Sequence, residues 1–182
     1  IAVRWTVDRS KPHALLSRTN AGIFDRAAVL VRAKPNARLK FVGGFDRYPF
    51  GKILDAYHLW SGANGQVKDP AIARFKTFAS MARYGREAGD AEVNGLVRVV
   101  DTHRHEIPRL YDEVKRAEVS DDRADAIFST AHKSKGLEWD QVVLDEDFVE
   151  LALDGADPAE VDEEEINLLY VALTRAIRSV QL

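Results

Sequence analysis

Hydrophobic and polar positions follow two different periods along the chain. Short apolar or alternating runs that are typical of β-strands occupy residues 2–7, 13–16, 38–42, 126–128, 141–144 and 179–182. Apolar residues spaced three and four positions apart predict helices over residues 21–33, 51–60 and 163–176. Strands that alternate with helices are typical of a parallel sheet covered by helices, and the sequence therefore predicts an α/β fold.

The middle of the chain has a different pattern. No strand pattern occurs between residues 61 and 122, where helices are expected over residues 70–84, 90–100 and 107–117. We therefore predict one α/β domain made of residues 1–60 and 123–182, with residues 61–122 as a short all-helical insertion.

Two local features refine the expected helices. Asn20 precedes the helix that is expected to begin at Ala21, and asparagine is a favoured N-cap residue. In the last helix the spacing predicts one buried face, formed by Ile166, Leu169, Leu173 and Ala176.

Composition limits the classes of function. An apolar content of 46% in 182 residues is enough for one sizeable core. The net charge of −3 provides no general basic field, so any contact with nucleic acid must come from a local patch. The chain has no cysteine, which excludes disulfides and thiolate chemistry. No apolar run reaches the roughly 20 residues of a membrane-spanning helix, so we expect no membrane partner. Because Ile1 opens directly on a strand pattern, we expect a fragment of a longer protein.

The stretch 129–139 concentrates the candidate chemistry between two expected strands. In open α/β sheets, loops beyond the strand ends are common sites for phosphate-bearing ligands. Four side chains of this stretch can reach a phosphate oxygen: Thr130, His132, Lys133 and Lys135. Gly136 allows the backbone to approach a ligand closely.

Other polar groups allow a structural and a functional interpretation. Arg175 follows the last helix, where a guanidinium can bind phosphate or satisfy helix carbonyls. We interpret Asp145–Asp147 as a solvated strand end rather than a magnesium site. We interpret His103–Glu106 as an exposed linker, since no third metal ligand lies at a suitable spacing. Trp139 is expected to be an exposed stacking platform.

Two stretches together resemble a known family. Residues 130–139, Thr-Ala-His-Lys-Ser-Lys-Gly-Leu-Glu-Trp, resemble motif V of UvrD/Rep-type superfamily 1 helicases, and residues 168–176 resemble motif VI. Arg18-Thr19-Asn20 resembles a connecting segment of the same family. The resemblance implies a RecA-like domain, the C-terminal motor half of an ATP-dependent 3′–5′ DNA helicase. The strings around Glu138 and Leu168 lean toward the F-box DNA helicase branch.

The resemblance implies a role for each matching residue. Arg175 would be an arginine finger at the γ-phosphate of ATP, and Lys135, Gly136 and Glu138 would lie near the nucleotide. Single-stranded DNA would be held by Thr130, His132 and Lys133, together with Arg18 and Asn20. ATP with Mg²⁺ would be bound mainly by the N-terminal RecA-like domain of the same protein. The location would be cytoplasmic and nucleoid-associated in a bacterium or phage, or nuclear in a eukaryote.

Departures from the family pattern leave alternatives open. A phosphate-binding loop needs G-x-x-x-x-G-K-[ST], and the nearest candidate, Gly51-Lys52, is followed by Ile53. The chain alone is therefore expected to be inactive. Ile166-Asn167 stands where many relatives have two arginines. One alternative is the helicase part of a RecB/AddA-type helicase–nuclease, and the other is a non-catalytic remnant that binds single strands or a partner protein.

Overall fold

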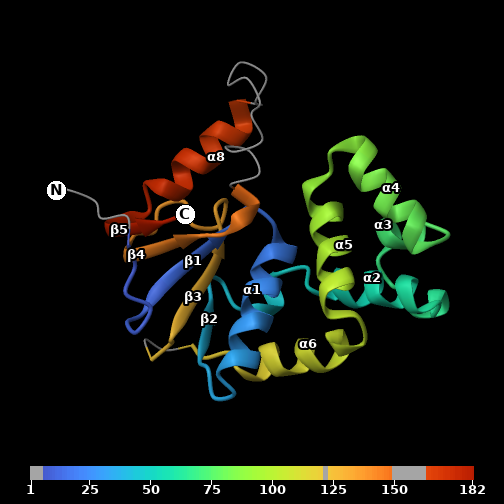
Figure 1. Cartoon of the computed structure of the whole chain (residues 1–182), viewed down its shortest axis with the longest axis horizontal. Helices are drawn as coiled ribbons and strands as arrows, with labels where there is room; N and C mark the ends of the chain where they lie inside the picture. Colours follow the sequence, from blue (N-terminus) through green and yellow to red (C-terminus); the bar gives the residue numbers. More distant parts are fainter. Residues whose placement is uncertain (1–5, 121–122, 149–162) are drawn as a thin grey trace.

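The computed structural model describes residues 6–120, 123–148 and 163–182 (Figure 1). Its strands form one parallel sheet in the order β2-β3-β1-β4-β5. The strands are β1 (His13–Ser17), β2 (Leu39–Phe41), β3 (Ala126–Thr130), β4 (Trp139–Leu144) and β5 (Ala176–Gln181). A parallel sheet flanked by helices confirms the expected RecA-like α/β fold.

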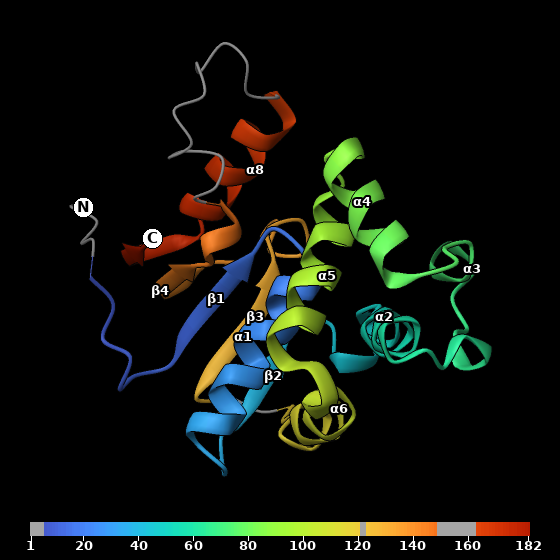
Figure 2. The same ribbon diagram turned by 45° about the vertical axis from the view of Figure 1, so that its right-hand side comes forward.

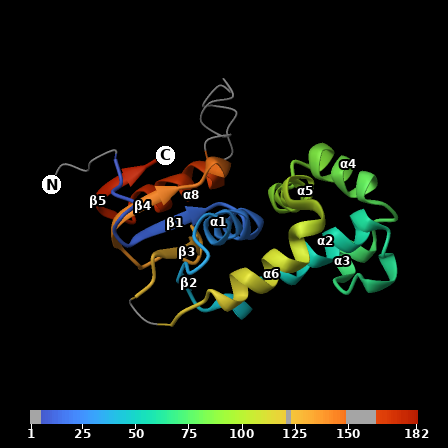
Figure 3. The same cartoon turned by 60° about the horizontal axis from the view of Figure 1, so that its bottom comes forward.

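Seven α-helices accompany the sheet in the described part of the chain. They are α1 (Asn20–Ala33), α2 (Gly51–Ser61), α3 (Pro70–Ala73), α4 (Phe78–Ala88), α5 (Ala91–His103), α6 (Ile107–Arg116) and α8 (Glu163–Leu173). Helix α8 lies on one face of the sheet, and α1 lies between the other face and α5 (Figures 1 and 3).

Alternation along each strand divides the core into two clusters. Ala14 and Leu16 of β1 face the α8 side, where they join Leu168 and Ala172. Phe128 of β3 faces the opposite side and packs with α1. Because successive strand residues point to opposite faces, a sheet that is buried on both sides needs apolar residues at nearly every position.

The helices of the middle segment share their core with the sheet. Helices α5 and α6 pack on α1 and α2, and their buried residues belong to the same cluster as Phe128. Aromatic rings fill the centre of this cluster, namely Phe24, Phe41, Phe45, Tyr48, Phe50, Tyr111 and Phe128. Figure 2 shows α2 to α5 stacked on the side of α1 that faces away from the sheet.

Three local expectations are corrected near the N-terminus and in the middle segment. Thr6 and Val7 belong to no strand, and residues 2–5 lie outside the described residues. Thr19, not Asn20, caps α1, because its hydroxyl accepts the Gly22 N–H at 2.9 Å. The single helix expected over residues 70–84 is divided into α3 and α4. Thr77 starts α4 with a reciprocal capping box to Ser80, which interrupts the helical run.

The last helix ends earlier than expected and buries a different face. It stops at Leu173, and β5 already begins at Ala176. Leu168 and Ala172 are its buried residues, whereas Ile166 is 48% exposed. Leu169 and Leu173, which the spacing placed on the buried face, flank the cluster as half-buried residues. Within the described residues, no helix has both the length and the apolarity that a membrane span requires.

The close approach of α1 and α5 gives a prediction for Gly95. A Cβ atom at this position would lie 2.9 Å from the Ala21 Cβ atom and 3.3 Å from the Thr19 hydroxyl. Gly95→Ala should lower the free energy of unfolding, because overpacking costs about 1–3 kcal/mol and outweighs a helix-propensity gain of about 1 kcal/mol. Urea unfolding measures the change.

Gly51 provides the matched control, because a Cβ atom there would meet nothing within 4 Å. Gly51→Ala in α2 should leave stability unchanged or raise it by up to about 1 kcal/mol. Equal unfolding midpoints for the two variants would contradict the close contact between α1 and α5.

Candidate functional site

The connection between β3 and β4 runs from the side of the sheet at which the parallel strands end, the carboxyl edge, to the side at which they begin, the amino edge. Thr130 ends β3 beside Ser17, at the carboxyl edge of the sheet. Trp139 begins β4 three residues before Val142, which pairs with Ala14 near the amino edge. Residues 131–138 therefore link the two edges, and the candidate residues of this stretch divide between them.

Hydrogen bonds within the connection hold it in a compact, turn-rich shape. The Ser134 N–H donates to the Thr130 carbonyl at 3.0 Å, and the Ser134 hydroxyl donates to the Ala131 carbonyl at 2.7 Å. Ser134 and Ala131 are fully buried. Gly136 has φ +82°, a left-handed conformation that favours glycine, and it lets the chain turn toward β4.

Arg175 is fastened to the end of this connection. Its Nη1 donates to the Leu137 carbonyl at 3.1 Å, its Nε to the Val171 carbonyl at 2.9 Å and its Nη2 to the Thr174 hydroxyl at 3.0 Å. A guanidinium has five N–H donors, so one donor on each terminal nitrogen is left for a ligand. The side chain is therefore oriented before any ligand binds.

The other expected nucleotide residues lie beside Arg175. Lys135, Gly136 and Glu138 are exposed on the same connection, and the Trp139 N–H donates to the Arg175 carbonyl at 2.9 Å. The structure thus places these four residues near the amino edge of the sheet, with Lys135, Gly136 and Glu138 exposed and Arg175 half-buried.

The expected DNA-binding residues of the connection lie near the carboxyl edge. Thr130 is 5% exposed, and its hydroxyl accepts the Lys133 N–H at 3.3 Å. His132 is exposed. The Lys133 ammonium donates to the Arg47 carbonyl at 3.3 Å and lies 4.6 Å from the centre of the Tyr48 ring. Its direction is therefore set by the segment that follows β2.

Arg18 and Asn20 are both held by carboxylates at this edge. The Arg18 guanidinium forms an ion pair with Glu165 of α8, and the side chains are 23% and 20% exposed. The Asn20 backbone N–H donates to Glu92 of α5 at 2.8 Å, and its side-chain amide contacts the same oxygen. Glu92 therefore occupies the N-terminus of α1, a position that favours an anion.

The strand end after β4 is buried at Asp145 and Asp147, so its interpretation as solvated was wrong for these two residues and is confirmed only for Glu146, which is exposed. Asp145 and Asp147 are each 4% exposed. Asp147 accepts hydrogen bonds from the Ser17 hydroxyl at 2.6 Å and from the Arg18 and Thr19 backbone N–H groups at 2.9 and 3.0 Å. The carboxylate takes the backbone donors that follow β1, so it fixes the segment that carries Arg18.

Burial and mutual repulsion act on the two carboxylates. Burial, followed by the charge of Asp147, raises the pKa of Asp145 above its usual value. Arg26 opposes this shift through its Nε, which lies 2.5 Å from an Asp145 oxygen. Gly22 leaves space for Ser17 and the two carboxylates. A Cβ atom at position 22 would lie 2.1 Å from the Ser17 hydroxyl oxygen and 2.8 Å from an oxygen of each carboxylate.

This network was not predicted from the sequence. Polar residues at the ends of two strands could have indicated it. Ser17 ends β1 and Asp145 follows β4, and these strands are neighbours in the sheet. The carboxyl ends of neighbouring parallel strands meet at the same edge, so the hydroxyl and the carboxylates had to meet there once the strand order was known.

Two further interpretations need correction. His103 is 2% exposed, and its Nε2 lies 2.6 Å from an Asp25 carboxylate oxygen, so it belongs to the α1–α5 interface and not to an exposed linker. Trp139 is half-buried and packs against the core on the α8 side, so it is not an exposed stacking platform.

Comparison with known proteins agrees with this arrangement. The family model described as UvrD-like helicase C-terminal domain matches residues 125–182, which include the whole β3–β4 connection and Arg175. Residues 125–182 thus correspond to a UvrD-like helicase C-terminal domain. The last third of the chain therefore supplies the sheet strands β3, β4 and β5 of that domain.

Relatives match over a longer part of the chain. F-box DNA helicase 1 of Gallus gallus is 32% identical over 184 residues, which cover 89% of this chain and 18% of that protein. F-box DNA helicase protein 1 of Schizosaccharomyces pombe is 31% identical over 179 residues, which cover 91% of this chain and 20% of that protein. The similarity thus extends beyond the matched domain, although the chain spans about a fifth of the length of these relatives.

The Asp147 network gives a prediction for this helicase domain. Asp147→Ala should lower the free energy of unfolding by about 2–4 kcal/mol, because each buried donor that loses its acceptor costs about 1–3 kcal/mol. Asp147→Asn keeps one acceptor oxygen and should lose less. Urea unfolding measures both variants, and an Asp147→Ala midpoint equal to that of the wild type would show that the carboxylate does not hold the segment after β1.

Proposed function

We propose that this chain is the second motor domain of an ATP-dependent 3′–5′ DNA helicase. One observation carries the proposal, namely the hydrogen bond from Arg175 to the Leu137 carbonyl. It joins the stretch that resembles motif V to the stretch that resembles motif VI. With the contacts to Val171 and Thr174, it leaves two guanidinium N–H donors for a ligand.

The nucleotide would bind at the amino edge of the sheet. Arg175 would contact the γ-phosphate of ATP as charge develops during hydrolysis, with Lys135, Gly136 and Glu138 alongside. The 182 residues contain no phosphate-binding loop, so the phosphates and Mg²⁺ would be held mainly by an N-terminal RecA-like domain of the same protein. Closure of the two domains would bring Arg175 to the phosphate.

The DNA strand would bind at the carboxyl edge. Thr130, His132 and Lys133 would contact its phosphates without reading sequence. Arg18 and Asn20 would join them by exchanging the carboxylates of Glu165 and Glu92 for phosphate oxygens, since both ligands are anionic acceptors. As both relatives are eukaryotic F-box DNA helicases, we propose the nucleus as the place of action.

Arg175→Ala in the full-length protein tests the arginine-finger role. DNA-stimulated ATP hydrolysis should fall by about 10³-fold or more, the usual effect of losing such an arginine. The dissociation constant for single-stranded DNA should stay unchanged, because Arg175 lies at the other edge of the sheet. Arg175→Lys should lose nearly as much activity, since one ammonium cannot make the three contacts of the guanidinium.

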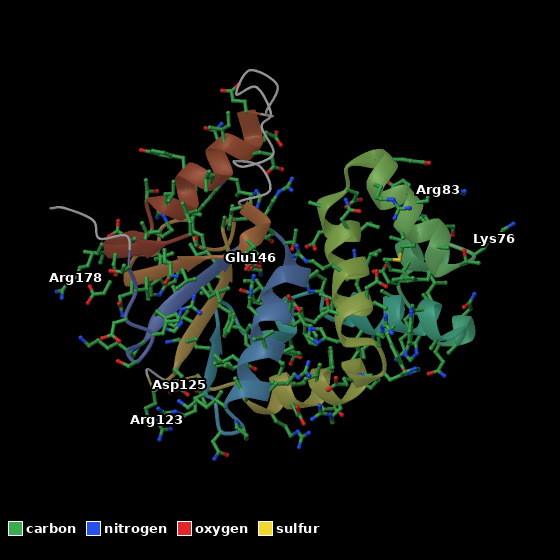
Figure 4. The ribbon with its side chains drawn as sticks, in the orientation of Figure 1. Lys76, Arg83, Arg123, Asp125, Glu146 and Arg178 are labelled. Carbon is green, nitrogen blue, oxygen red and sulfur yellow. The ribbon has the colours of Figure 1, made fainter. Side chains whose placement is uncertain are left out.

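Arg178→Ala is the matched control. Arg178 lies in β5, three residues after Arg175, and is exposed, with an ion pair to Asp140 (Figure 4). This variant should hydrolyse ATP at the wild-type rate. The finger assignment would be refuted by an Arg175→Ala protein that is as active as the Arg178→Ala protein.

A further inference from the structure

A guanidinium that lies over two neighbouring aromatic rings marks the outer side of the middle helices. Arg74, at the end of α3, lies 5.0 Å from the centre of the Phe75 ring and 4.9 Å from that of the Tyr84 ring. The two rings are 5.4 Å apart. Stacking restricts the side chain without using its N–H donors, and no hydrogen bond or ion pair of this guanidinium is found among the described residues.

Other cations extend this position into a basic surface. Lys76 precedes α4 and Arg83 lies within it, and both side chains point away from the sheet into solvent (Figure 4). Neither forms an ion pair with a described residue. Residues 70–89 contain four cationic side chains and one carboxylate, although the net charge of the whole chain is −3. We call Arg74, Lys76 and Arg83, with the two rings, the α3–α4 patch.

A pocket joins the α3–α4 patch to the proposed DNA edge. It has a volume of about 260 Å³, and its lining includes Asn20, Lys52, Arg74 and Phe75. Asp90 and Glu92 lie on the α5 wall of the same pocket. These carboxylates accept backbone N–H groups at the starts of α5 and α1, which favour negative charge, whereas the cations line the α2 and α3 wall.

We propose that the α3–α4 patch is a second contact for the phosphate backbone of single-stranded DNA. The inference rests on the proposed function, since the strand would continue from Asn20 through the pocket to Arg74 and then along Lys76 and Arg83. The pocket, with a volume of about 260 Å³, is too small to hold a duplex, which favours a single strand. The contacts are to phosphate, so binding there is independent of base sequence.

Oligothymidylates of increasing length test this path in the full-length protein. Wild-type affinity should rise once the strand is long enough to reach the patch. In Arg83→Glu and Lys76→Glu this rise should shrink by about fivefold, the upper range for an exposed ion pair. For each lost phosphate contact, the slope of log affinity against log salt should fall by about 0.7. Oligomers too short to reach the patch should bind as tightly as they bind the wild type.

Arg9→Glu is the matched control, because Arg9 is exposed and lies before the amino end of β1, at the edge of the sheet opposite Asn20. It should keep the wild-type rise in affinity. Arg74→Lys should lose part of the rise, because lysine keeps the charge but not the planar stacking.

The outcomes separate this inference from the proposed function. An unchanged rise with length in the Lys76→Glu/Arg83→Glu double variant would overturn the α3–α4 patch and leave the helicase proposal intact. If the double variant lost affinity only for a duplex junction and not for oligothymidylate, the assignment of the α3–α4 patch to single strands would be overturned. A wild-type protein that binds no oligothymidylate of any length would refute the proposed function itself.

Discussion

The parallel order of the sheet is the constraint on which the candidate site depends. Thr130 leaves the sheet at its carboxyl edge and Trp139 re-enters near the amino edge, so eight residues must cross between the edges. Buried Ser134 anchors the middle of this connection. A connection of this length has little slack, because an extended residue spans at most about 3.6 Å and several of these residues are wound into turns. We therefore expect a displacement at one end of the connection to be transmitted to the other end.

Two polar networks lie at the two ends of this connection. At the amino edge Arg175 contacts the Leu137 carbonyl, which ties the connection to the segment between α8 and β5. At the carboxyl edge Asp147 gathers the backbone donors after β1, and Arg18 reaches from there to Glu165 at the start of α8. Helix α8 thus has contacts at both edges, through Glu165 near its start and through the Val171 carbonyl near its end.

The class of fold and the strands β1 to β4 could be predicted from the sequence, and the resemblance of residues 130–139 to a helicase motif could be recognised in it. These features depend on local pattern. Interpretation of the sequence was wrong where the burial of a side chain depends on a contact with a residue distant in the chain. Asp145 and Asp147 were interpreted as solvated because their partners, Ser17 and Thr19, lie almost 130 residues away. His103 was interpreted as part of a linker because Asp25 lies on another helix. Strand order brings such residues together, and no single stretch encodes it.

Coupling of the nucleotide edge to the DNA edge through one short connection can be measured directly. The quantity is the factor by which a non-hydrolysable ATP analogue changes the dissociation constant for oligothymidylate in the full-length protein, compared with a variant that carries one glycine inserted after Gly136. We expect the insertion to reduce this factor toward one while each ligand alone still binds. An unchanged coupling factor in the lengthened protein would contradict this role of the connection.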